Sequence, residues 1–206
     1  MSKSPFNLAW QNADLPSKIT AGLERMSGVF RTLLWEYAKT IGLSPIQIQV
    51  LIFVASHDDA LCNVSYLARE FNVTKPTISD ALKVLEKKGL ISKISSADDK
   101  RAYTIALTES GKDIVNETES FANPVKKLVE ELSNEEQEHL FNSLKKMIFG
   151  LNQAGIINVQ RICFGCRFYE KKKVNHFCHF LNAELADSDI RLNCPEFEEK
   201  AKNSDR

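Results

Sequence analysis

Four of the five cysteines in this 206-residue chain lie in its last quarter, where their spacing suits metal chemistry. Cys163 and Cys166 form a Cys-x2-Cys pair, and Cys178 and Cys194 follow it, the last one directly before Pro195. A Cys-x2-Cys turn holds two thiolates beside one centre, and the remaining ligands can come from farther along the chain. The four cysteines are therefore predicted to bind a metal ion or an iron–sulfur cluster.

The residues around these cysteines bear on which group they hold. Structural zinc sites made of four cysteines usually use two close pairs, and this chain has one pair. The scattered Cys178 and Cys194, the Cys-Pro step and nearby aromatic rings favour an iron–sulfur cluster, with four-thiolate zinc as the alternative. A third interpretation is redox thiols that form disulfides on oxidation. The aromatic rings are those of Phe164, Phe168, Phe177 and Phe180.

Two histidines flank Cys178, and one cysteine lies far from the others. His176 or His179 could replace a sulfur ligand, but we interpret both as surface residues beside a ligand. Cys62 is predicted to be a small buried hydrophobe, because an isolated cysteine usually behaves as one.

The cysteine-rich segment contains too few aliphatic residues to fold unaided. With 206 residues and 43% apolar content, the chain allows one main core and a small appendage. An appendage of about 45 residues with so little aliphatic content barely offsets its ordering entropy. Binding of the metal group is therefore expected to provide its folding free energy.

Charge is distributed unevenly along a chain whose formal net charge is zero. Residues 71–101 contain seven basic residues and four acidic ones, whereas residues 102–160 contain five lysines and nine acidic residues. A neutral chain has no global field that attracts nucleic acid, so a nucleic-acid surface must come from a local basic region. Residues 71–101 are the candidate for that surface.

Apolar periodicity and capping residues predict the elements that position these groups. Apolar residues three and four apart, with caps at Ser44, Asn63 and Thr74, predict successive helices. Alternating apolar residues on both sides of a polar turn predict a hairpin. The order is that of a winged helix-turn-helix, with helices and hairpin over residues 16–41, 46–56, 63–71, 74–88 and 90–107. A long helix kinked at Pro124 is predicted over residues 108–132, and Ser133 begins another.

The helix over residues 74–88 would read DNA, because the second helix of the turn enters the major groove. Its apolar residues face the core, and its outer face can contact bases and phosphates. Asp80 is interpreted as a surface partner of Lys83 or Lys87. In the hairpin turn, a basic tip would meet the minor groove. The predicted contacts are Ser65, Lys75, Pro76, Thr77, Ser79, Asp80 and Lys83, and in the wing Asp99, Lys100 and Arg101.

Residues 44–111 resemble the MarR family of regulators. The motifs that carry the resemblance are Leu67-Ala68, Thr77-Ile78-Ser79, Leu85-Glu86-Lys87-Lys88-Gly89-Leu90-Ile91, Asp98-Asp99-Lys100-Arg101 and Leu107-Thr108-Glu109-Ser110-Gly111. The resemblance implies a homodimer whose N-terminal helix and last two helices pack around a two-fold axis. It also implies a palindromic operator on double-stranded DNA, usually with repression relieved by a ligand or by oxidation.

The predicted fold class is mainly α: a winged helix-turn-helix with a two-stranded wing, N- and C-terminal dimerisation helices and a small cysteine-rich C-terminal extension. We divide the chain into an N-terminal arm and dimerisation helix, a winged-helix domain, C-terminal dimerisation helices and the extension. These cover residues 1–44, 45–110, 111–155 and 156–206. A small-molecule effector pocket between the dimerisation helices and the winged domain remains open, with Trp10, Trp35 and Tyr37 as lining or core residues.

Other classes of protein are less consistent with the sequence. No βαβ pattern surrounds Cys163-Phe164-Gly165-Cys166, as a thioredoxin-like enzyme requires, and no nucleophile elbow, phosphate loop or zinc-protease motif occurs. We therefore predict no enzyme, with a thiol redox enzyme and a structural zinc module for protein contacts as alternatives. Residues 1–12 lack a signal-peptide run, and no stretch approaches the ~18 apolar residues of a membrane span. A cytoplasmic protein without a membrane partner is expected.

Overall fold

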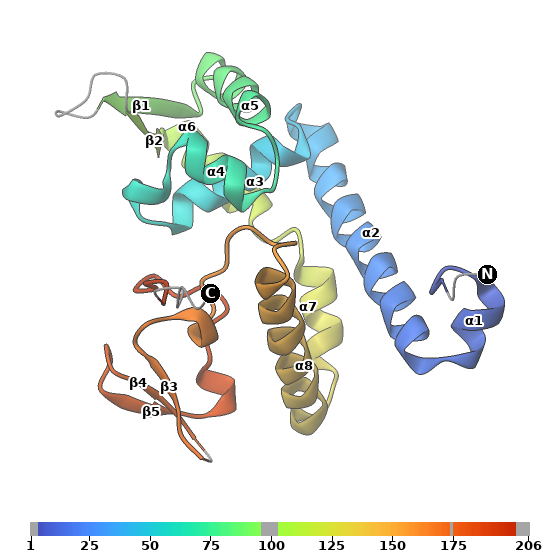
Figure 1. The fold of residues 1–206 in the computed structure, drawn as a ribbon. Helices are drawn as coiled ribbons and strands as arrows, with labels where there is room; N and C mark the ends of the chain where they lie inside the picture. Colours follow the sequence, from blue (N-terminus) through green and yellow to red (C-terminus); the bar gives the residue numbers. More distant parts are fainter. Residues whose placement is uncertain (1–3, 96–102, 174, 201–206) are drawn as a thin grey trace.

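The computed structural model describes residues 4–95, 103–173 and 175–200. It is mainly helical, with one two-stranded and one three-stranded antiparallel sheet in the described part. The predicted mainly α, winged-helix fold is confirmed. The four parts of the molecule are an N-terminal arm, a winged domain, a helical pair over residues 123–153 and the extension (Figure 1).

The N-terminal arm consists of two helices, α1 (Leu8–Ala13) and α2 (Leu15–Ile41). Asp14 caps α2 by accepting a hydrogen bond from the Ser17 amide, and Gly42 ends it in the left-handed conformation at φ 63°. Only the C-terminal part of α2 packs into the core, through Leu34 and Ala38. The rest extends away from the body and ends beside α1, a helix that the sequence pattern did not predict (Figure 1).

The winged domain is built around a buried central helix. Ile48, Val50 and Leu51 of that helix have no exposed surface, and Cys62 is equally buried, as predicted. Burial raises the pKa of the Cys62 thiol to about 11. This central helix is α3 (Pro45–Ser56). The other elements of the domain are, in order, η1 (Asp59–Leu61), α4 (Val64–Glu70), α5 (Lys75–Lys87), β1 (Ile91–Ser95) and β2 (Tyr103–Leu107). The wing strands pair in register from Ile91 opposite Leu107.

The chain after the wing differs from the single kinked helix predicted over residues 108–132. Instead α6 (Glu109–Thr118) ends in a turn, and α7 (Asn123–Glu130) begins after it. Pro124 has no amide hydrogen to donate within a continuous helix, but in the first turn of α7 it needs no intrahelical partner. The chain therefore breaks completely where a kink was expected. Ser133 caps α8 (Asn134–Gln153), and Glu136 completes the predicted capping box.

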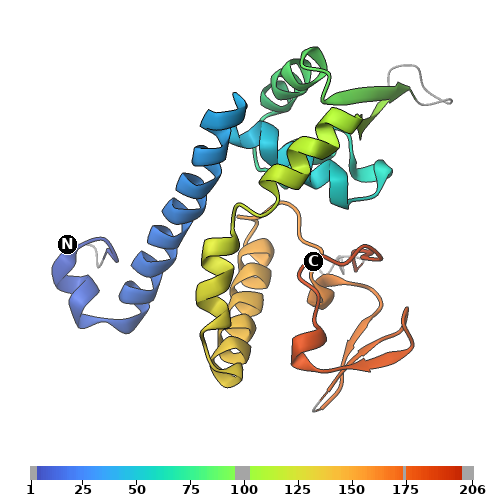
Figure 2. The same cartoon turned by 180° about the vertical axis from the view of Figure 1, so that it is seen from behind.

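The extension folds beside α8 and below the winged domain (Figure 2). Its short elements were not predicted: η2 (Cys163–Gly165), β3 (Tyr169–Lys171), β4 (His176–Cys178), β5 (Ala183–Leu185) and η3 (Asp187–Asp189). The strands form an antiparallel sheet in sequence order. Ile162, Cys163 and Ile190 form a small core of their own, and Phe149 from α8 packs against it. The extension is therefore a distinct cluster that is attached to the helical pair.

Among the described residues, no single helix is long and apolar enough to cross a membrane. The pair formed by α2 and α3 passes that test only when taken together, and it bends by 94°. Gln47, Ile48, Val50, Leu51 and Phe53 of α3 are buried.

Candidate nucleic-acid interface and cysteine cavity

The helix-turn-helix is formed by α4 and α5, which the turn at Asn72 joins. Asn72 takes a left-handed conformation at φ 52°, which asparagine tolerates better than most residues. The Thr74 side chain accepts a hydrogen bond from the Thr77 amide and caps α5. Ile78, Leu82 and Leu85 are buried on the inner face of α5. The opposite face and the N-terminal turn are consequently directed to solvent.

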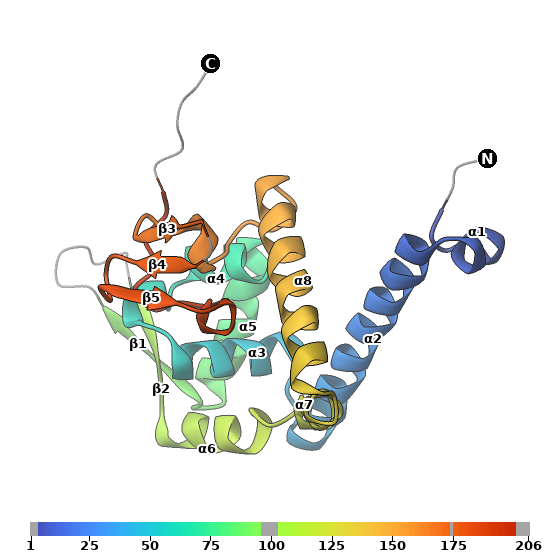
Figure 3. The same cartoon turned by 90° about the horizontal axis from the view of Figure 1, so that it is seen from below.

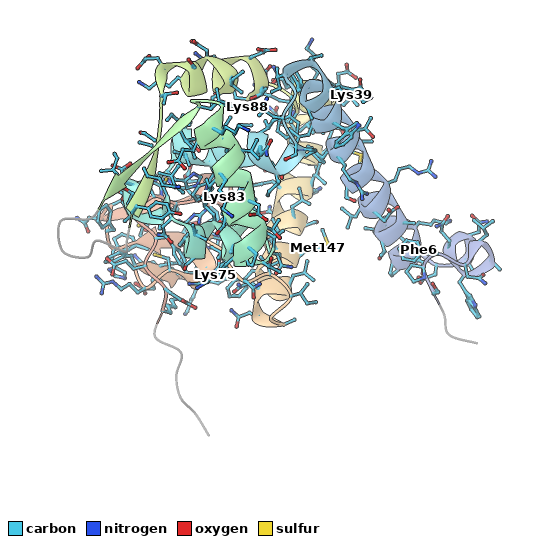
Figure 4. The ribbon with its side chains drawn as sticks, turned by 90° about the horizontal axis from the view of Figure 1, so that it is seen from above. Phe6, Lys39, Lys75, Lys83, Lys88 and Met147 are labelled. Carbon is cyan, nitrogen blue, oxygen red and sulfur yellow. The ribbon has the colours of Figure 1, made fainter. Side chains whose placement is uncertain are left out.

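The predicted contact residues on these two helices have an accessible surface. Lys75, Pro76, Thr77, Asp80 and Lys83 are exposed on α5, Ser65 is exposed on α4, and Ser79 is half-buried. Figure 4 shows the labelled lysines Lys75 and Lys83 of α5 and Lys88, its C-cap, spread along the helix on the face turned to the viewer. The structure thus leaves these residues at least partly accessible, and their roles as contacts remain predictions.

Three of these residues, Thr77, Asp80 and Lys83, already have partners in α5 or at its N-cap. The Thr77 hydroxyl lies 2.8 Å from the Thr74 hydroxyl, so it takes part in the cap. The Asp80 carboxylate accepts a hydrogen bond from the Lys83 ammonium at 2.9 Å, and both side chains are exposed. The interpretation of Asp80 as a surface partner of Lys83 is confirmed.

The wing is attached to α5 at its base. The Lys93 ammonium of β1 donates to the Glu86 carboxylate of α5 at 2.5 Å, and this hydrogen bond raises the pKa of Lys93. Asp99, Lys100 and Arg101, the predicted residues of the wing tip, lie outside the described residues.

All four cysteines of the extension surround one cavity. Cys163 begins η2, Cys166 directly follows it, Cys178 ends β4, and Cys194 comes after η3. Apolar side chains complete the wall, among them Phe168, Tyr169, Phe180, Leu181 and Leu185. Within residues 4–95, 103–173 and 175–200, no three His, Cys, Asp or Glu side chains lie in an arrangement that could hold a metal ion. The four cysteines that the sequence analysis grouped by their spacing do line one cavity. That they bind a metal ion or an iron–sulfur cluster remains a prediction.

The polar environment of these thiols comes mainly from Arg191. Its amide donates to the Cys163 sulfur at 3.3 Å, and its guanidinium lies 3.7 Å from the Cys194 sulfur. Burial nevertheless raises the pKa of both Cys163 and Cys194. Both thiols are thus held in an environment that disfavours a free thiolate, a cost that a bound cation would remove.

The two histidines differ, and the surface interpretation is wrong for one of them. His176 is 8% exposed, and its ring contacts the Tyr169 hydroxyl at 2.6 Å and the Asp187 carboxylate at 2.8 Å. It is buried because β4 alternates its faces, which gives His176 and Cys178 the same side of the strand. His179 lies on the surface and pairs with Glu170 at 2.9 Å.

The sequence analysis did not single out Arg161, a buried residue of the extension. Arg161, 8% exposed, joins the extension to the helix-turn-helix by an ion pair with Glu70 of α4 at 2.8 Å. No local pattern marks this residue, because its partner lies 91 positions away in the sequence. Of the aromatic residues considered for an effector pocket, Trp35 is 51% exposed and Tyr37 packs against the main core.

Comparison with known proteins agrees with this architecture. The MarR family model matches residues 41–102. The chain is 31% identical over 98 residues to the HTH-type transcriptional regulator SarZ of Staphylococcus haemolyticus, a match that covers 48% of this chain and 66% of SarZ, just under two thirds. These findings define a winged helix-turn-helix protein of the class found in transcriptional regulators.

Solved structures give the same result. The MepR–DNA complex of S. aureus aligns with a TM-score of 0.57 and 28% identity over 64% of this chain and 97% of MepR. A MarR transcriptional regulator from Methanosarcina mazei Go1 aligns with a TM-score of 0.57 over 66% of this chain and 97% of its own, at 19% identity, which supports the fold. Residues 41–102 match the MarR family model, and the chain is similar in sequence and fold to transcriptional regulators. Each of these matches leaves about a third or more of the chain unaligned.

Proposed function

We propose that this chain is a cytoplasmic, homodimeric transcriptional regulator, acting as a repressor, that binds a palindromic operator. We further propose that an iron–sulfur cluster on Cys163, Cys166, Cys178 and Cys194 controls binding. The observation that carries the DNA-binding part is the exposed, lysine-bearing outer face of α5 on a helix-turn-helix of the MarR type. The similar MepR of S. aureus has been solved in complex with DNA, which supports the same activity for this chain.

The chemistry of α5 suits the major groove. A helix fits that groove with its N-terminal residues against base edges, and here that end carries Lys75, Pro76 and Thr77 without burial. Lys75 and Lys83 would neutralise phosphates, an interaction that depends strongly on salt. Because Asp80 is paired with Lys83, its repulsion from the DNA backbone is reduced.

Dimerisation is supported by apolar surface on the N-terminal arm. Figure 3 shows α1 and most of α2 held out from the body. Large apolar side chains are between 37% and 67% exposed along α2, and similar ones occur on α8. A monomer rarely exposes so much contiguous apolar surface, and a second copy would cover it. These residues are Leu15, Ile19, Leu23, Met26, Val29 and Phe30 of α2, with Leu140, Met147 and Leu151 of α8.

The cysteine cavity supports a bound inorganic group, because four thiols line it together with apolar side chains. A cluster bridges ligands through several iron atoms, whereas zinc needs all four sulfurs at about 2.3 Å from one ion. The single close pair, the scattered Cys178 and Cys194 and the aromatic rings in the wall favour the cluster, and zinc is the alternative outcome of the test. Free cysteines are also what a reducing cytoplasm maintains.

The DNA-binding part is tested by selecting duplexes from a random pool with the full-length protein. We expect an inverted repeat to be enriched. Lys75→Ala should weaken binding to it about uniformly across sequences and lower the salt slope by about 1. Lys126→Ala, on α7, removes a similarly exposed lysine far along the chain from α5 and serves as the control. Unchanged affinity and salt slope for Lys75→Ala would contradict the assignment of α5.

The cofactor part is tested by purification without air, followed by metal and sulfide analysis and a visible spectrum. A brown protein with broad absorption and bound iron supports the cluster, whereas a colourless protein with one zinc per chain replaces the cluster by zinc. Neither metal in wild-type protein, with Cys163→Ser indistinguishable from it, would contradict the cofactor proposal.

Dimerisation is tested by light scattering. Wild-type protein should have nearly twice the 23.3 kDa of one chain. Leu23→Asp should shift it to the monomer, and Glu24→Gln on the same helix should not.

A further inference from the structure

The cysteine extension is connected to the helix-turn-helix by the guanidinium of Arg161. Its Nη1 donates to the Glu70 carboxylate at 2.8 Å and also to the Tyr66 hydroxyl, while Nη2 lies 3.2 Å from the second Glu70 oxygen. Tyr66 and Glu70 both lie on α4, the first helix of the turn. Arg161 is 8% exposed, so this bidentate ion pair is largely removed from water.

Asn193, directly before Cys194, completes the connection. Its side-chain oxygen accepts a hydrogen bond from Nε of Arg161, and its amide nitrogen donates to Nε2 of His57 at 2.7 Å. Arg161 lies 3.2 Å from the same His57 nitrogen. His57 follows the last residue of α3, so the extension contacts both α3 and α4 through one hydrogen-bonded group.

The backbone of the same group supports two of the four thiols. The Cys194 amide donates to the Arg161 carbonyl at 3.1 Å, and the Cys163 amide donates to the Arg191 carbonyl at 3.2 Å. Arg161 and Asn193 form a parallel bridge between these segments. A displacement of Cys163 or Cys194 on binding a metal group therefore moves the backbone that carries the Arg161 and Asn193 side chains.

We propose that Arg161 and Asn193 are positioning residues that transmit the state of the cysteine cavity to α4, and through α4 to α5. This inference rests on the proposed function. The buried ion pair with Glu70 suits such a role, because separating it leaves an uncompensated charge, so extension and helix move together. A second contact reinforces it: the Asn158 amide donates to the Asn72 side chain, at the turn itself, at 2.6 Å.

The extension has another attachment, to α8, which offers a competing route through the dimerisation helices. The Lys145 side chain, 1% exposed, bonds the Asp187 carbonyl oxygen. Signalling by this route would not require Arg161. The two routes are separated by variants that remove the connection to α4 and leave Lys145 in place.

Two variants and one control are compared with wild-type protein, each prepared in two forms. The stripped form is made with chelator, and the loaded form is made with ferrous iron and sulfide, or with Zn²⁺ if analysis shows zinc. Asn193→Ala removes the bridge, and Arg161→Met with Glu70→Gln removes the ion pair without leaving a buried charge. The control, Arg167→Gln, removes an exposed ion pair with Glu198 in the same extension.

The measured quantity is the ratio of the affinities of loaded and stripped protein for the selected duplex. We expect a ratio of roughly 5- to 150-fold for wild-type protein and Arg167→Gln, the usual range for coupled sites. Both test variants should keep their metal content but bring the ratio to about 1. Amide hydrogen exchange of residues 64–70 should respond to loading in wild-type protein and not in these variants.

The outcomes separate the inference from the proposed function. Test variants that keep both their metal and the wild-type ratio would overturn the role of Arg161 and Asn193, while the metal-controlled regulator would stand. Loss of metal from both variants would also overturn it, since these residues would then build the site and not transmit its state. A wild-type ratio of 1, or no metal in wild-type protein, would overturn the proposed control and this inference with it.

Discussion

The winged domain and the cysteine extension are stabilised by different means. The winged domain has a continuous aliphatic core that runs from the C-terminal part of α2 to α6 and includes Ile48, Leu51 and Leu82. The extension has only Ile162, Cys163 and Ile190 as a buried centre, with aromatic rings packed around it. Apolar burial can account for the first region, whereas the second has four thiols where a larger domain would have a core. From this comparison we predict that the first region folds unaided and that the second depends on a bound group.

Removal of the bound group should produce the largest effect and should be confined to the extension. Structural metal binding contributes about 10–16 kcal/mol in small zinc peptides, far more than the short sheet of the extension can replace. We expect residues 156–200 to become sensitive to protease and residues 45–118 to remain protected. Limited proteolysis with mass spectrometry measures this, and Cys163→Ser should resemble the stripped protein. Equal protection of the extension with and without metal would remove the distinction between the two regions.

A cavity made in the core of the winged domain should instead destabilise the winged domain. Leu82 is 1% exposed on α5, and Leu82→Ala should cost about 2–5 kcal/mol in the free energy of unfolding of this domain. The loss should be equal in loaded and stripped protein, because the core contains no metal ligand. Denaturant titration followed by circular dichroism measures it. The control is Val84→Ala, at a site on the same helix that is 39% exposed. It should lower the free energy of unfolding by much less than Leu82→Ala does. A Leu82→Ala cost that depends on metal would show that the two regions fold as one unit.

The junction between the wing and α6 is predicted to tolerate no added atom. A Cβ on Gly111 would lie 2.0 Å from the carbonyl oxygen of Leu90, which is backbone and cannot rotate away. Gly111→Ala should therefore cost about 1–3 kcal/mol, within the winged domain only. Gly150→Ala in α8 meets nothing within 4 Å, and it should be neutral or stabilise by up to about 1 kcal/mol. Thermal unfolding of both variants compares them, and equal melting temperatures would contradict the crowding at Leu90.

The sequence predicted the winged domain better than the extension for a physical reason. Caps such as Ser44, Thr74 and Ser133 are local signals, and each lies directly before the helix that it begins. In contrast, the strands β3, β4 and β5 have three residues each, which is too short for a clear alternation. The turn between α6 and α7 was missed because Pro124 fits a kink as well as a helix start.

The candidate sites divide in the same way. The spacing of the cysteines predicted the set of thiols around the cavity, because the sequence itself gives the residue type and the number of residues between the cysteines. The Arg161 connection could not be found from it, because Glu70 and His57 are brought to Arg161 only by the packing of the extension against the winged domain. Likewise, nothing local showed that His176 would be buried between Tyr169 and Asp187.

The smallest expected effect concerns Cys62, the one cysteine outside the extension. It has no exposed surface, and burial raises its pKa to about 11, so at pH 8 only about one molecule in a thousand carries the reactive thiolate. Its labelling by iodoacetamide requires the aliphatic core to open, whereas the thiols of the stripped extension need only local opening. We expect mass spectrometry of stripped protein at pH 8 to show Cys178 and Cys194 alkylated within the time in which Cys62 stays unmodified. Mild denaturant that unfolds the winged domain should bring Cys62 to the same rate, which controls for its intrinsic reactivity. Cys62 labelled as fast as Cys178 in native protein would show that the winged core opens as easily as the extension, and the contrast between a self-supporting domain and a ligand-dependent one would no longer hold.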